Sequence, residues 1–116
     1  MKSKNKKLVP FHARQGDVLI TRIASLPASL NKVPRDSGRV ILAYGEVTGH
    51  SHALADKHCE LFTPTVPGAS VTYLEITEAI AALTHDEHAT IQLEPGVYEI
   101  TRQREYSPEA IRNVAD

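Results

Sequence analysis

The stretch RVILAYGEVTGHSHAL, residues 39–54, contains the clearest strand signal in the chain. It begins with β-branched and other apolar residues, which predict a buried strand over residues 39–47. Gly45 and Gly49 then indicate a bulge, a bend or a close approach of the backbone. The segment HSHALA that follows is expected to be extended as well. This part of the chain therefore favours a β fold.

Further short strands are expected on both sides of this stretch. The composition predicts strands for GDVLITRI (residues 16–23), CELFTP, VTYLEI (residues 71–76) and TEAIAALT, and two strands in ATIQLEPGVYEITRQREY that join at Glu94-Pro95-Gly96. TEAIAALT would also suit a helix by composition, but it is short and lies between strands. The two prolines and Asp-Ser-Gly of ASLPASLNKVPRDSG predict a long loop, and TPTVPGAS predicts a turn.

Short strands separated by turn residues are typical of an all-β domain, built as a small antiparallel β-barrel or sandwich. The 116 residues match one domain, with a flexible basic tail over residues 1–8 and a single β domain over residues 9–116. A short terminal helix is predicted over residues 107–115, because Ser107 suits an N-cap and Pro108 suits the first helical position.

Charge and cysteine content narrow the expected partners and location. The formal net charge is −1, which gives no reason to expect nucleic acid or a membrane surface as a partner. No apolar run approaches the roughly 18 residues that a membrane span needs. Cys59 is the only cysteine, so an internal disulfide is excluded, and a reducing cytoplasmic location is expected.

Four of the six histidines fall into two tight clusters. His50 and His52 are two residues apart, so on a strand they project from the same face. His85 and His88 enclose two acidic residues. A tight hairpin would oppose them at about 5 Å, while a longer loop or a single helical turn stays open as an alternative. Because neutral imidazole is the commonest metal ligand, we expect one divalent metal site, with zinc first and iron or manganese as alternatives.

The alternative is that the two clusters lie on separate loops and never meet. If they meet, three protein ligands with an open position would make a catalytic zinc site, and four would make a structural one. Glu46, Glu87 and Asp86 are nearby carboxylates, any of which could bind the metal, orient a ligand through a hydrogen bond or act as general base. Glu46 and Glu87 are the candidate catalytic residues. Asp17 is expected to be a turn acid. Arg102 could bind an anion, but a solvated strand end is preferred.

The segments QGDVLI, GEVTGHSHAL, HDEH and PGVYEITRQREY resemble a family of small uncharacterised bacterial and phage-borne proteins. The resemblance covers residues 15–116 and implies that these segments form one unit, without implying an activity.

A looser resemblance is to the cupins, small β-barrels that hold a metal through a Gly-rich His-x-His segment, a glutamate and a later histidine. Gly45, His50 and His52 resemble the first segment. Glu60 stands further along than the cupin glutamate. The HDEH histidines precede the Glu-Pro-Gly turn, whereas the cupin histidine follows its turn. The resemblance implies a metal-binding β-barrel.

Three functions remain to be distinguished. The first is a metal-dependent enzyme, most simply a hydrolase, in which zinc lowers the pKa of its bound water to about 7 for attack on a small polar substrate. The second is a non-enzymatic module of phage or mobile-element type that binds a protein partner or forms a homo-oligomer, with a structural metal or none. The third, nucleic-acid binding, is disfavoured by the charge and the lack of a basic-aromatic motif. Metal binding is the expectation, and catalysis is left open.

Overall fold

The computed structural model describes residues 10–44 and 50–102. Within them the chain forms ten strands: β1 (His12–Gln15), β2 (Val18–Ile23), β3 (Leu30–Val33), β4 (Val40–Tyr44), β5 (Ser51–Leu54), β6 (Cys59–Pro64), β7 (Thr72–Ile76), β8 (Ala81–Thr84), β9 (Ile91–Leu93) and β10 (Gly96–Arg102). No helix of these residues is long and apolar enough to cross a membrane. The predicted tail over residues 1–8, the predicted helix over residues 107–115 and Glu46 lie outside the described residues.

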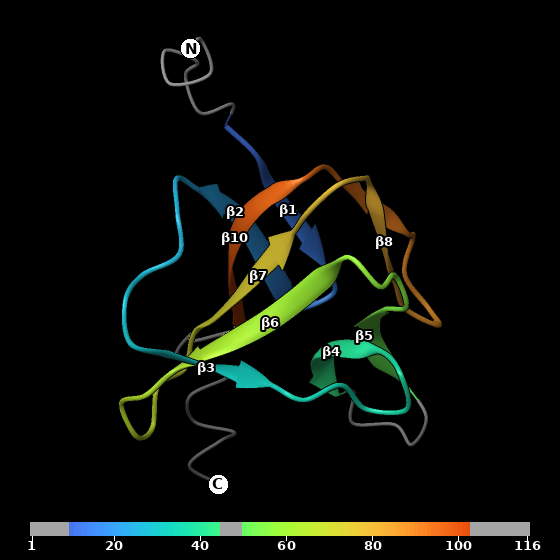
Figure 1. Ribbon diagram of the computed structural model, residues 1–116. Helices are drawn as coiled ribbons and strands as arrows, with labels where there is room; N and C mark the ends of the chain where they lie inside the picture. Colours follow the sequence, from blue (N-terminus) through green and yellow to red (C-terminus); the bar gives the residue numbers. More distant parts are fainter. Residues whose placement is uncertain (1–9, 45–49, 103–116) are drawn as a thin grey trace, which may run out of the picture.

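The strands form two antiparallel sheets (Figure 1). The larger has six strands in the order β1-β2-β10-β7-β6-β3, and the smaller has four in the order β4-β5-β8-β9. The end strands of each sheet have one neighbour apiece within the described residues, so neither sheet closes on itself. The fold is therefore all-β and sandwich-like. This confirms the predicted fold class and, of the two predicted architectures, the sandwich. The closed barrel, which the cupin resemblance also implied, is not formed.

The hydrophobic core joins the two sheets. In β2, Val18 and Ile20 are fully buried while Leu19 and Thr21 are partly exposed, because successive side chains of a strand point to opposite faces. Tyr98 of β10 is also buried in this core, and its hydroxyl donates to the carbonyl of Glu94 at 2.6 Å. The smaller sheet contributes a set of fully buried residues: Leu54, Ala81, Leu83 and Leu93.

Two predictions about the strands were wrong or incomplete. The segment predicted as a long loop contains the edge strand β3, which pairs with β6 in the register Leu30↔Pro64. Its apolar signal is weak because its middle residues are exposed. In TEAIAALT only Ala81–Thr84 forms a strand, β8, and the chain turns before it at Glu78, which has a φ of 73°.

The turn at Glu94-Pro95-Gly96 joins two strands as predicted, but these strands do not pair with each other. Strand β9 pairs with β8 in the smaller sheet, whereas β10 pairs with β2 and β7 in the larger. This turn therefore carries the chain from one sheet to the other. As a result, β10 ends at Arg102 next to the start of β2, where Arg102 is paired with Val18.

Candidate metal centre

The two histidine clusters meet because β5 pairs with β8. Ala53 is paired with Thr84 in this antiparallel ladder, and the same register places His52 beside His85. The ring centroids of His52 and His85 are 4.3 Å apart, those of His85 and His88 are 4.7 Å apart, and those of His50 and His85 are 5.9 Å apart. The alternative in which the clusters lie on separate loops and never meet is therefore wrong.

The loop that carries His85 and His88 is longer than a tight hairpin. Strands β8 and β9 pair as Leu83↔Ile91, so residues 85–90 connect them. Asp and Glu do not favour the positive φ that a two-residue turn requires, which explains why this loop is wider. Of the alternatives open from the sequence, the structure has the longer loop.

His52 is buried and is held by a glutamine from the other sheet. The residue is 3 % exposed, and its Nδ1 lies 2.8 Å from Oε1 of Gln15 in β1. The side-chain amide nitrogen of Gln15 donates to the carbonyls of Leu83 and Ala89, both at 2.9 Å. Those two bonds fix the orientation of the amide, so Oε1 can only accept. His52 must therefore carry its proton on Nδ1, which leaves the lone pair on Nε2.

The protonation state of His52 follows from its surroundings. Burial lowers its pKa to about 4, and the neighbouring His85 adds to that effect. The ring is therefore neutral at pH 7. Neutral imidazole with a free lone pair is the form that binds a metal ion.

Asp17 and Arg102 extend the histidine cluster on the side of Nε2 of His52. Asp17 lies in the turn between β1 and β2, and its Oδ1 is 3.8 Å from Nε2 of His52. Nε of Arg102 donates to the other carboxylate oxygen of Asp17 at 2.9 Å, and a terminal nitrogen of Arg102 donates to the carbonyl of Tyr44 at 3.2 Å. Asp17 is thus a turn residue, as predicted, but it also faces the histidines. Arg102 is not simply a solvated strand end.

Because residue 16 is a glycine, the imidazole rings of His52 and His88 can lie against the backbone of the β1–β2 turn. Its φ is +61°, a conformation that favours glycine. A Cβ at this position would lie 2.9 Å from Nε2 of His88 and 3.2 Å from Cε1 of His52. The same small space above Gly16 is therefore bordered by both rings, whose centroids are 6.1 Å apart with planes 13° from parallel.

His50 lies against the acidic loop. Its Nε2 is 3.6 Å from a carboxylate oxygen of Asp86, and its Nδ1 is 3.8 Å from a carboxylate oxygen of Glu87. The backbone N–H of Glu87 donates to Nδ1 of His85 at 3.0 Å. The candidate base Glu87 is thus at the edge of the cluster, whereas the other candidate, Glu46, falls outside the described residues.

The donor atoms do not yet converge on one point. Among residues 10–44 and 50–102, no group of three or more His, Cys, Asp or Glu side chains is already arranged to hold one metal ion. Because Nδ1 of His85 accepts a hydrogen bond, the proton of its neutral ring is on Nε2. Metal binding here would require rotation of imidazole rings in the β8–β9 loop.

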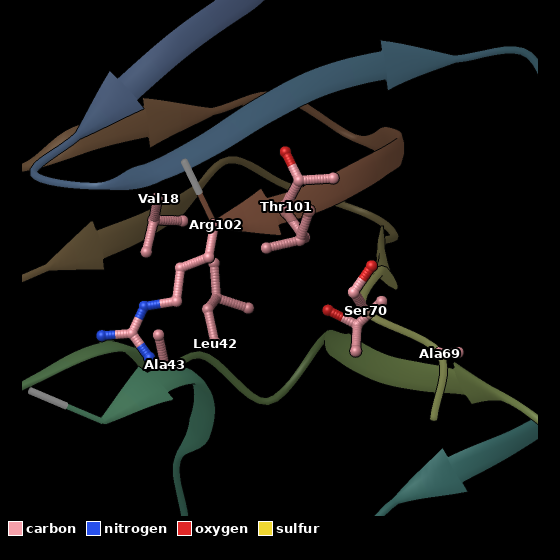
Figure 2. A pocket seen from close by; sticks show the side chains of 9 residues that line it. Val18, Leu42, Ala43, Ala69, Ser70, Thr101 and Arg102 are labelled. Atoms are coloured by element: carbon pink, nitrogen blue, oxygen red, sulfur yellow. The ribbon is translucent and has the colours of Figure 1, made fainter. Parts of the chain in front are cut away.

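A cavity of about 140 Å³ lies beside the Asp17–Arg102 pair. Its walls come from β2, β4, β7, β10 and the turn before β7. Figure 2 shows Arg102 extending from β10 beside Leu42, with Ala69 and Ser70 on the opposite side. The lining is mainly apolar, with hydroxyl-bearing side chains from Ser70, Thr72 and Thr101. The cavity is large enough for a small group, and Arg102 is the residue that it shares with the candidate centre.

The chain matches the model of a domain of unknown function, DUF8820, over residues 14–103. It belongs to this family. No curated protein and no solved structure matches the chain. The part of the chain that matches the DUF8820 model includes the whole candidate centre, from Gln15 and Asp17 through the four histidines to Arg102.

Proposed function

We propose that this DUF8820 domain binds one divalent transition-metal ion at the histidine cluster, with ligands drawn from His50, His52, His85 and His88. The observation that carries the proposal is the tautomer of His52, which is set by its hydrogen bond to Gln15. A buried glutamine holds its Nδ1–H, so the unprotonated Nε2 is directed away from Gln15. Metal-binding histidines are commonly oriented by such a hydrogen bond to the second ring nitrogen.

The donor types favour zinc, with iron or manganese as the alternatives. Imidazole suits zinc, iron, copper and nickel, whereas sites for magnesium or calcium are built from oxygen. The carboxylates of Asp17, Asp86 and Glu87 are available beside the rings. A site of mixed nitrogen and oxygen ligands accepts zinc and also iron(II) or manganese(II).

We expect untagged protein to contain close to one equivalent of zinc, iron or manganese, measured by inductively coupled plasma mass spectrometry. The double variant His52→Ala, His88→Ala should lose the metal, because both rings border the space above Gly16. The matched control is His12→Ala, His58→Ala, which removes two histidines that bond elsewhere, to Thr21 and to the carbonyl of Ile80. Wild-type protein without metal, even after reconstitution, would contradict the proposal and favour the non-enzymatic binding or assembly module of phage type.

A metal-dependent hydrolase is the enzymatic form of this proposal, and the cavity beside Arg102 is the observation that favours it. The bound ion would supply an activated water, and Glu87, 3.8 Å from His50, is the candidate to move its proton. A small polar substrate with a short apolar part would fit the mainly apolar lining.

We expect zinc-loaded protein to hydrolyse 4-nitrophenyl acetate or bis(4-nitrophenyl) phosphate faster than zinc in buffer. The substitution Glu87→Gln should lower kcat by about 100-fold, the lower range for loss of a general base. Equal rates for the protein and for free zinc with both esters would argue against the hydrolase and leave metal binding intact.

A further inference from the structure

Two electron-pair donors face each other at the β1–β2 turn. Nε2 of His52 is unprotonated because Gln15 holds the proton on Nδ1, and Oδ1 of Asp17 lies 3.8 Å away from it. A neutral ring nitrogen and a carboxylate oxygen repel each other unless a cation or a proton donor lies between them. Zinc binds His nitrogen at about 2.0–2.1 Å and carboxylate oxygen at about 2.0–2.2 Å, so one ion can reach both atoms where they stand.

Asp17 is held in position for this role. Its Oδ2 accepts from Nε of Arg102 at 2.9 Å, which leaves Oδ1 to face His52. Arg102 is itself anchored on the carbonyl of Tyr44. The carboxylate is therefore fixed by a charge-assisted hydrogen bond before any ion arrives.

The other acids near the cluster lack this arrangement. Asp86 and Glu87 lie against His50, and their side chains are 56 % and 67 % exposed. Among the hydrogen bonds of the described residues, no side chain fixes either carboxylate as Arg102 fixes that of Asp17. His50 and His85 are thus tied to the acidic loop, whereas His52 and His88 border Gly16 next to Asp17.

We propose that Asp17 is the carboxylate ligand of the metal centre and that His52 and His88 are its histidine ligands. The inference rests on the proposed metal-binding function and names the ligands of that site. Three protein ligands leave a coordination position for water or substrate, which makes the centre open and not a closed four-histidine site. The Gln-Gly-Asp turn then provides three functions in sequence: Gln15 orients His52, Gly16 makes room for the rings, and Asp17 binds the ion.

The test uses the untagged full chain and two measurements on each variant. Zinc affinity is measured by competition with a chromogenic chelator, and cobalt(II) is added to record the visible spectrum, which reports the ligand set. Asp17→Asn should lower zinc affinity by at least about 100-fold. Loss of a residue that only hydrogen-bonds to a ligand costs at most about that much. The same variant should change the cobalt(II) bands, because one ligand is lost. The matched control Asp86→Asn removes the same charge beside His50 and should leave the affinity within about threefold of wild type.

Each outcome decides between the two proposals. Wild-type affinity and an unchanged cobalt(II) spectrum in Asp17→Asn would overturn the inference while metal binding stands. Equal losses in Asp17→Asn and Asp86→Asn would also overturn it, because the effect would then be one of general charge. Wild-type protein that binds neither zinc nor cobalt(II) would remove the proposed function itself. If Asp17→Asn does not fold, Asp17→Glu keeps the charge and the Arg102 partner, and unchanged cobalt(II) bands in that variant would count against ligation.

Discussion

Replacing Gln15 with methionine should lower the free energy of unfolding by about 3–5 kcal/mol, as expected when several buried polar groups lose their partners. Methionine has nearly the length of glutamine but no hydrogen-bonding amide. The substitution leaves three groups without their partner: the carbonyls of Leu83 and Ala89, and Nδ1 of His52. Gln15 is 2 % exposed, so water cannot easily replace the amide. The loss is large because the glutamine joins both sheets at this end of the sandwich.

The measurement is urea unfolding at pH 7 in the presence of a chelator, so that bound metal does not add to the stability. His12→Ala is the control on the same strand, since His12 is exposed and, among the hydrogen bonds of the described residues, its side chain bonds only to the hydroxyl of Thr21. This control should cost less than about 1 kcal/mol, as is usual for surface positions. A loss below about 1 kcal/mol in Gln15→Met would mean that the three hydrogen bonds do not stabilise the fold.

The strands with a strong apolar pattern can be predicted from the sequence, whereas β1 and β3, the two end strands of the larger sheet, cannot. The patterns of β2, β4, β6 and β7 predict strands because their buried residues are mostly branched or large, and in β2, β6 and β7 these residues recur on one face. Strands β1 and β3 have sequences HARQ and LNKV, whose exposed polar residues give no such pattern. The extended conformation of β1 is fixed by its hairpin pairing with β2, and that of β3 by pairing with β6, which is distant in the sequence.

Half of the candidate centre could likewise be predicted. The spacing of His50 and His52, and of His85 and His88, indicated two pairs, but only the β5–β8 register shows that the pairs meet. The sequence alone does not place the Gln-Gly-Asp turn at the site, for two physical reasons. Gln15 is 37 residues from His52 in sequence, and glutamine is not a usual metal ligand, so residue type alone does not point to it. The available signal was a glycine between two polar residues at the start of a buried strand.

The stability of the metal-free protein should fall by roughly 3 kcal/mol as the pH falls from about 6.5 to about 4, because of His52 alone. In the unfolded chain this histidine has the ordinary pKa of 6.5, whereas in the folded protein burial lowers its pKa to about 4. His85, His88 and Arg102 lower the pKa further, and Asp17 partly opposes them. Between these two values the unfolded state binds more protons than the folded state. The contribution of His52 is therefore complete above pH 6.5 and is lost progressively as the pH falls to 4.

The pH dependence can be assigned to His52 by comparing slopes in urea unfolding between pH 7 and pH 4.5. His52→Gln removes the titrating ring while its amide can still donate to Oε1 of Gln15, so this variant should show a flatter dependence than wild type. His12→Gln removes an exposed histidine and should keep the wild-type slope. Carboxylates remote from residue 52 contribute equally to all three proteins, so the difference between slopes reports the His52 ring together with its interaction with Asp17. Parallel curves for wild type and His52→Gln would mean that His52 takes up its proton in the folded protein as readily as in the unfolded chain, and hence that its lone pair is not kept free at neutral pH by burial.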